Sequence, residues 1–225
     1  METTLHRQLK ALYSGDDSLQ EVALRGYRID AVVADRLVEI QYGSLGAIRD
    51  KVRALLADHD VLVVKPLAAR KYLVKLARRG GRIVSGRYSP TRETFHHVFD
   101  DLVHFTGVFG HPRLTLEVVL TEQEEHRVAA HKPRRRSKGY RVEDRLLRHI
   151  EGRMQLRSID DLLALLPGGL PPAFSTGDIA KAADIPRWLA QKMAYCLRET
   201  GAIEIVGKKS NALLYRIAGD NRRAA

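Results

Sequence analysis

Apolar and polar positions in the first part of the chain repeat with two different periods. Leu5, Leu9 and Leu12 recur at the spacing of one helix face, which predicts a helix over residues 2–14. The positions that follow alternate between apolar and polar every second residue, as they do in half-buried strands. Strands are predicted there over residues 19–24, 27–33 and 37–42.

A second helix and a fourth strand are predicted to follow these three strands. Ser44 is suited to cap a helix that extends to about residue 58, whose apolar side chains form one stripe. Residues 60–65 are predicted to form a buried strand that Pro66 closes. The predicted order over the first 68 residues is therefore α-β-β-β-α-β.

The middle of the chain is predicted to mix strands and helices. The Gly80-Gly81 pair between two apolar runs indicates a hairpin turn. The predicted elements are a hairpin over 70–88, a helix over 91–105, a strand over 114–121, and helices over 142–152 and 158–166.

The last third of the chain has the element order of a winged helix. A helix is predicted from Ser175 to about Ala183, and a second over 186–199 begins at Pro186, where a proline is tolerated. Two strands, 202–206 and 212–217, are joined by residues 207–211. Helix, turn, helix and β-hairpin in this order predict a winged helix-turn-helix.

Charge divides the chain further. Of the net charge of +11, residues 1–130 carry +2, residues 131–166 carry +5 and residues 167–225 carry +4. Residues 131–141 hold six positive charges and no acidic side chain, which is typical of a linker or mobile arm. We expect an α/β domain over 1–130, a basic connector over 131–157 and a winged helix over 158–225.

Two carboxylates in the hairpin of residues 27–42 are candidates for a metal-binding site. Strand alternation puts Glu39 and Gln41 on one face, and the hairpin brings Asp30 beside them. Buried carboxylates are costly unless a positive group holds them, and a hard cation such as Mg²⁺ would do so. The alternative is that these are polar edge residues that face water.

This hairpin, within the α-β-β-β-α-β order of residues 1–68, resembles the PD-(D/E)XK nuclease superfamily. The resemblance implies a restriction-endonuclease-like α/β fold, a mixed sheet flanked by helices. It also implies that Asp30 and Glu39 bind Mg²⁺ or Mn²⁺ together with the backbone carbonyl of Ile40, and that Glu2 is the acid on the first helix. Gln41 stands where the family usually has Lys, and it can orient water but cannot take its proton. The residue before Asp30 is isoleucine, where the family pattern has proline.

The chain as a whole resembles the endonuclease subunits of heteromeric transposases and an uncharacterised family of bacterial proteins. This resemblance implies a Mg²⁺-dependent endonuclease that acts on double-stranded DNA, and a homodimer would supply the two active sites of a double-strand cut. One alternative is a DNA-binding regulatory protein whose nuclease-like domain is inactive. A third is a module that binds RNA or protein.

Basic and polar side chains of the C-terminal region are the candidate DNA contacts. Leu189, Met193 and Cys196 share one face of the helix over 186–199, and a polar and basic stripe lies opposite, as a major groove requires. A surface for protein contact is the alternative. The predicted contacts are Arg187, Gln191, Lys192, Tyr195 and Arg198 on this helix, Lys208, Lys209 and Asn211 at the wing tip, and Arg134, Arg135, Arg136 and Lys138 in the connector.

Composition limits the cellular compartments and the metal cofactors that can be expected. The single cysteine excludes an internal disulfide framework, and no apolar run approaches the roughly 18 residues of a membrane span. The first 20 residues lack the apolar stretch of a signal peptide. We therefore expect a soluble cytoplasmic protein without a membrane partner. Neither a Cys-x-x-Cys nor a His-Glu-x-x-His sequence occurs, so no zinc site is expected.

Overall fold

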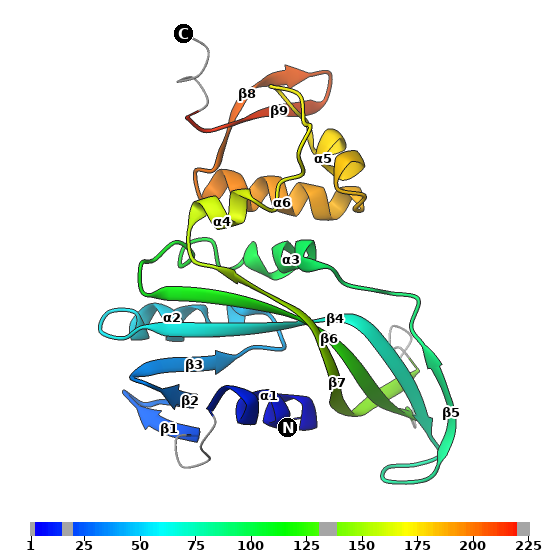
Figure 1. The fold of residues 1–225 in the computed structure, drawn as a ribbon. Helices are drawn as coiled ribbons and strands as arrows, with labels where there is room; N and C mark the ends of the chain where they lie inside the picture. Colours follow the sequence, from blue (N-terminus) through cyan, green and yellow to red (C-terminus); the bar gives the residue numbers. More distant parts are fainter. Residues whose placement is uncertain (1–2, 15–19, 131–138, 220–225) are drawn as a thin grey trace. The chain divides into compact units, whose positions relative to one another are not determined.

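The chain folds as a mixed α/β protein, a sheet flanked by helices (Figure 1). The computed structural model describes residues 3–14, 20–130 and 139–219. The helices are α1 (Thr4–Ser14), η2 (Leu45–Ile48), α2 (Arg49–Leu55), η3 (Phe95–His97), α3 (Val98–Leu102), α4 (Ile159–Leu163), α5 (Thr176–Ala182) and α6 (Arg187–Glu199). The strands are β1 (Gln20–Leu24), β2 (Tyr27–Val33), β3 (Arg36–Ile40), β4 (Val61–Leu76), β5 (Ile83–Tyr88), β6 (Leu114–Ala129), β7 (Tyr140–Leu156), β8 (Ile203–Lys209) and β9 (Ala212–Ile217).

Contacts divide the chain into two compact units, each built from three separated segments. The first comprises Met1–Tyr42, Val64–Thr94 and Val118–Met154. The second comprises Gly43–Val63, Phe95–Glu117 and Gln155–Ala225. Three of the five boundaries between the units therefore fall within β4, β6 and β7, and the other two follow β3 and precede η3.

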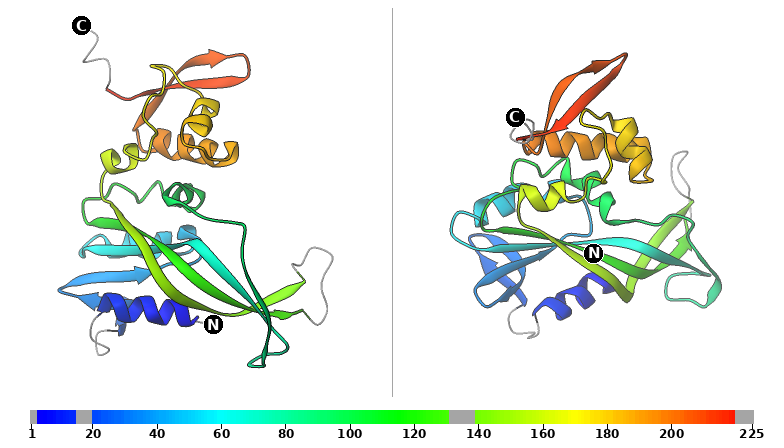
Figure 2. Two further views of the ribbon diagram at one scale, coloured as in Figure 1. Left: turned by 45° about the vertical axis from the view of Figure 1, so that its right-hand side comes forward. Right: turned by 45° about the horizontal axis from the view of Figure 1, so that its top comes forward.

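The main sheet has the strand order β1-β2-β3-β4-β6-β7, and β5 pairs with β4 beside this path. The pairs β1–β2, β2–β3 and β4–β5 are antiparallel. β3 and β4 point the same way, as expected for strands that a helical crossover joins (Figure 1). β4, β6 and β7 are long and strongly twisted in both views of Figure 2.

The predicted order α-β-β-β-α-β is confirmed over α1 to β4. Ala34 and Asp35 form the turn between β2 and β3, and their φ angles of 47° and 64° are those of a tight two-residue hairpin. α1 packs against β2 and β3 in the first unit. The Gln8 side chain of α1 also accepts a hydrogen bond from the Leu147 amide of β7 at 2.8 Å.

The helix predicted over residues 142–152 is wrong, because this segment lies inside β7. Val142, Leu146 and Ile150 are four residues apart, and this spacing fits one face of a helix and also one face of a strand. Pairing with the rest of the sheet decides the outcome. Residues 140–156 of the predicted connector thus belong to the sheet, and residues 131–138 lie outside the described residues.

Two other predicted boundaries are also corrected. Pro66 does not end its strand, because β4 continues to Leu76. Proline lacks an amide donor, but its fixed φ is compatible with extended backbone. The helix predicted over 91–105 is shorter, since only η3 and α3, residues 95–102, are helical.

The C-terminal part of the second unit contains three helices and a two-stranded antiparallel hairpin. α5 and α6 pack together, and α6 also packs against α4 and β8. Phe174, just before α5, exchanges two backbone hydrogen bonds with Tyr215 of β9. Phe174, Ile179, Leu189 and Met193 are buried here.

Among the described residues, every helix is too short or too polar to cross a membrane.

Candidate functional site

Asp30 is a residue of β2 in the first unit, and its side chain contacts both α1 and β3. Its Oδ2 accepts a hydrogen bond from the Ile40 amide at 2.8 Å, and its Oδ1 lies 3.2 Å from Nε2 of His6 on α1. The register that pairs Ala31 with Val38, extended by one residue, sets Asp30 opposite Glu39. The structure therefore brings Asp30, Glu39 and Ile40 together, as the sequence predicts.

Asp30 is held as an anion by its neighbours. Burial alone would raise the pKa of its carboxyl, but the hydrogen bonds from His6 and Ile40, with the positive charges of His6 and Lys10, bring the pKa below its ordinary value. Lys10 is itself buried and forms an ion pair with Glu21. His6 and Lys10 were not predicted, because only tertiary packing brings α1 over this hairpin.

The described residues do not by themselves complete a magnesium site. Both oxygens of Asp30 accept hydrogen bonds from the chain, and the Glu39 side chain is only 4% exposed. No group of three His, Cys, Asp or Glu side chains in the described part of the chain is arranged to hold a metal ion. Gln41 follows the end of β3, where its amide donates to the Val64 carbonyl at 2.9 Å, and Glu2 lies outside the described residues.

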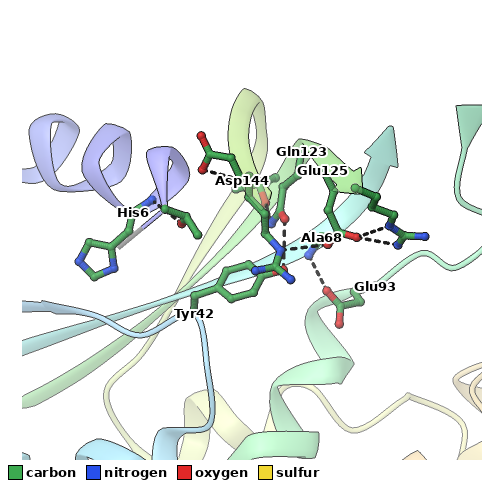
Figure 3. Close-up of polar contacts among 11 residues, drawn as sticks. His6, Tyr42, Ala68, Glu93, Gln123, Glu125 and Asp144 are labelled. Carbon is green, nitrogen blue, oxygen red and sulfur yellow. Dashed lines mark hydrogen bonds and ion pairs between the residues drawn. The ribbon is translucent and has the colours of Figure 1, made fainter. Parts of the chain in front are cut away.

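A second polar cluster, unforeseen in the sequence, lies further along the sheet of the first unit (Figure 3). The Tyr42 hydroxyl donates to Gln123 at 3.4 Å, and the Arg145 guanidinium lies 4.6 Å from the Tyr42 ring centre. Glu125 accepts from Arg127 at 2.6 Å and from Arg145 at 3.0 Å. Burial raises the pKa of Tyr42 to about 12, which keeps its hydroxyl protonated at neutral pH.

Every second residue of β6 from Thr121 to Glu125 contributes to this buried polar face. Thr121, Gln123 and Glu125 are all buried, although a continuous run of polar residues such as 121–127 usually meets water. The Thr121 hydroxyl donates to the Leu67 carbonyl at 2.8 Å, and Gln123 donates to Thr121 at 2.8 Å. These bonds offset the cost of burying polar groups. The sequence shows this run of polar residues but does not reveal that alternate members of it are buried.

The predicted DNA-contact stripe on α6 divides into an exposed part and a part held by α3. Arg187, Gln191 and Tyr195 are exposed, and Arg198 lies beside them with its guanidinium 5.5 Å from the Tyr195 ring centre. Lys192 forms an ion pair with Asp100 of α3. Lys192 is therefore engaged within the second unit.

The opposite side of α6 is buried, as predicted for Leu189, Met193 and Cys196. Ala194 is three residues after Gln191 and four before Arg198, the spacing of the predicted polar stripe, but it is only 1% exposed because it faces the core. Burial raises the pKa of the Cys196 thiol to about 12, so this cysteine behaves as a small buried hydrophobe.

The β8–β9 hairpin is longer than predicted. Lys208 and Lys209 belong to β8, and only Ser210 and Asn211 form the turn. Ser210 has a φ of 53°, as a tight hairpin turn requires. Lys208, Lys209 and Asn211 are exposed. Arg134, Arg135, Arg136 and Lys138 of the predicted contacts lie outside the described residues.

A basic region of the first unit was missed because charge was summed over the whole of residues 1–130. No acidic residue occurs between Asp60 and Glu93. Nine basic residues fall in that interval: Lys65, Arg70, Lys71, Lys75, Arg78, Arg79, Arg82, Arg87 and Arg92. A shorter window would have revealed this stretch, which corresponds to β4 and β5.

Comparison with known proteins gives a family without an assigned activity. The profile of a family described as "Domain of unknown function (DUF8091)" matches residues 3–157. An uncharacterized protein of Treponema pallidum (strain Nichols) is 32% identical over 224 residues, which cover 98% of this chain and 88% of that protein. No solved structure matches the chain significantly.

Proposed function

We propose that this chain, which belongs to the DUF8091 family, binds double-stranded DNA through α6 and the β8–β9 hairpin in the manner of a winged helix. The observation that carries the proposal is the division of α6 into a buried side and an exposed side with Arg187, Gln191 and Tyr195, beside the half-buried Arg198, which pairs with Glu199. Arginine and glutamine are side chains that read base edges in the major groove. A helix of this kind, packed on a preceding helix, is the reading element of helix-turn-helix proteins.

The hairpin after α6 supports the same proposal. Lys208 and Lys209 lie near its tip, and neither forms an ion pair with a carboxylate among the residues that the structure describes. Lysines at a hairpin tip suit phosphate contact, which positions a protein on DNA without reading sequence. The net charge of +11 favours the same class of partner.

Titration of the purified chain into a fluorescent DNA duplex, followed by anisotropy at several salt concentrations, tests this proposal. Arg187→Ala with Gln191→Ala should weaken binding by tenfold or more, since each base contact contributes about 1–3 kcal/mol. Lys208→Ala with Lys209→Ala should reduce the salt slope by about two. Arg53→Ala, which removes an exposed charge from α2, is the control and should bind as the wild type does. Wild-type affinity in all three variants would refute the proposal.

DNA cleavage by the first unit is a second candidate function. One observation favours it: the strand register sets Asp30 opposite Glu39, the arrangement that the nuclease resemblance implies. Two observations favour the alternative, a DNA-binding protein whose nuclease-like region no longer cuts. One oxygen of the Asp30 carboxylate is occupied by His6, and Glu39 is buried.

Plasmid nicking with Mg²⁺ or Mn²⁺ separates these alternatives. An endonuclease should lose nicking in Asp30→Asn and Glu39→Gln, while Arg187→Ala with Gln191→Ala should only weaken it through binding. Unchanged nicking by both carboxylate variants would remove this active-site assignment. Calorimetry without uptake of either metal, with and without DNA, would favour the regulatory alternative.

A further inference from the structure

The acid-free stretch of residues 61–92 forms a strand pair with two different faces. In the β4–β5 register, Tyr72 lies opposite Tyr88, whereas Lys75 lies opposite Ser85 and Leu73 opposite Arg87. Because directly opposite residues share a face, the tyrosines mark one face, and Lys75 and Arg87 mark the other.

The tyrosine face is neutralised by carboxylates. Arg70 lies 4.7 Å from the Tyr88 ring centre and 3.7 Å from a carboxylate oxygen of Glu122. Arg148 of β7 lies over Tyr72 and forms an ion pair with Glu124. Each guanidinium on this face therefore has both an aromatic and an acidic partner.

The opposite face carries uncompensated charge. All residues of β5 are exposed, as is Lys75. Among the residues that the structure describes, neither Lys75 nor Arg87 forms an ion pair with a carboxylate. Lys75 and Arg87 are diagonal neighbours, so the Cα atoms of these two cationic residues lie roughly 7–8 Å apart on this face.

These two cations line a groove that crosses four strands of the first unit. The groove has a volume of about 340 Å³. Its side chains include Leu73 and Lys75 of β4, Ser85 and Arg87 of β5, Arg127 of β6 and Tyr140 of β7, and none is a carboxylate. We call it the β4–β7 groove.

The third cation of the groove is fixed in place. The Arg127 guanidinium stacks 3.9 Å from the Tyr140 ring centre and bonds to Glu125 at 2.6 Å. Glu125 is buried and shared between Arg127 and Arg145, so the three side chains together carry one net positive charge. Leu73 and Tyr140 give the groove an apolar floor beside its charges.

We propose that the β4–β7 groove is a second contact surface for DNA, which it holds by the phosphodiester backbone. Three cations without a carboxylate in the lining complement a polyanion, and point charges on rigid strands bind phosphates without reading bases. This inference rests on the proposed DNA-binding function and adds to it a surface outside α6 and the β8–β9 hairpin.

The anisotropy titration tests the groove with four forms of the full chain: wild type, Lys75→Gln with Arg87→Gln, Arg187→Ala with Gln191→Ala, and all four substitutions together. Loss of two phosphate contacts should reduce the salt slope of the first variant by about two and weaken its binding several-fold. The fourfold variant should bind more weakly than either double variant. Arg70→Gln with Arg148→Gln, from the neutralised face, is the matched control and should retain the wild-type salt slope. Circular dichroism verifies that each variant is folded.

The outcomes separate this inference from the proposed function. Wild-type affinity and salt slope in Lys75→Gln with Arg87→Gln, together with weak binding by Arg187→Ala with Gln191→Ala, would overturn the groove and keep the proposed function. The reverse pattern would support the groove and overturn the α6 assignment. Absence of DNA binding by the wild type would overturn both.

Discussion

Asp30 shows how neighbours set the state of a single carboxyl. Its two oxygens meet the Ile40 amide and the His6 ring, and the second contact depends on α1 lying over the β2–β3 hairpin. The hairpin position of Asp30 could be predicted from alternation and a tight turn. Its histidine partner could not, because residues 6 and 30 are far apart in sequence and no local pattern joins them.

Asp30 should contribute to stability in a defined pH range. Its pKa is lowered in the folded protein, so its contribution should be present above the ordinary value of 3.8 and lost as the pH falls through the lower folded value. Asp30→Asn should reduce the free energy of unfolding at neutral pH by roughly 1–3 kcal/mol, and the difference should close in acid. Urea denaturation between pH 7 and pH 2.5 measures this.

His6→Ala provides the graded comparison, because it removes the His6 contact and leaves Asp30 the hydrogen bond from the Ile40 amide and the positive charge of Lys10. The free energy of unfolding that His6→Ala loses between pH 7 and pH 2.5 should lie between the losses of the wild type and of Asp30→Asn. A gap between wild type and Asp30→Asn that stays constant, or widens, as the pH falls would contradict the assignment.

Helix starts were predicted better than strand limits. Ser175 precedes α5 with a complete capping box: its hydroxyl accepts from the Gly177 and Asp178 amides, and the Asp178 carboxylate accepts from the Ser175 amide at 2.7 Å. Such caps are local in sequence and can be recognised without a structure. The end of β4 and the strand conformation of β7 depend on pairing with distant strands, so the sequence pattern ended β4 too early and predicted a helix within β7.

Removal of this cap should destabilise the second unit measurably. Ser175→Ala should lower the free energy of unfolding by about 1 kcal/mol, because two amides at the start of α5 lose their acceptor. Ser175→Thr retains the hydroxyl and should lose much less. Urea denaturation monitored by circular dichroism compares the three proteins, and equal losses in both variants would show that the cap is not the cause.

Charge and linker composition suggest domain limits near residues 130 and 158, whereas the contacts within the chain give two units with other limits. Residues 158–225 have the local element order of a separate domain, yet the second unit also contains Gly43–Val63 and Phe95–Glu117. Contacts inside this unit include His96 to the Leu165 carbonyl at 3.1 Å and the ion pair of Lys192 with Asp100. Sequence composition cannot reveal such long-range assembly, because each segment reads locally as an ordinary helix or strand.

A fragment of residues 158–225 should therefore be less stable than the same residues in the full chain. Loss of Asp100 and of His97, whose ring lies 6.3 Å from that of Trp188, should expose the α3 side of α6. We expect a lower melting temperature and a red-shifted emission from Trp188, the single tryptophan. Thermal unfolding followed by fluorescence measures both. A fragment that melts cooperatively at the temperature of the full chain would show that the C-terminal elements fold alone.

The interleaving of the two units along the chain also limits where the gene can recombine without disrupting the fold. A gene segment can be exchanged without harm only when it encodes a unit that folds by itself. Here each unit is composed of three separate segments of the chain. One crossover point between residues 43 and 154 would leave both units incomplete. Recombination should consequently be rare within residues 43–154, and relatives should keep this stretch of chain without a break.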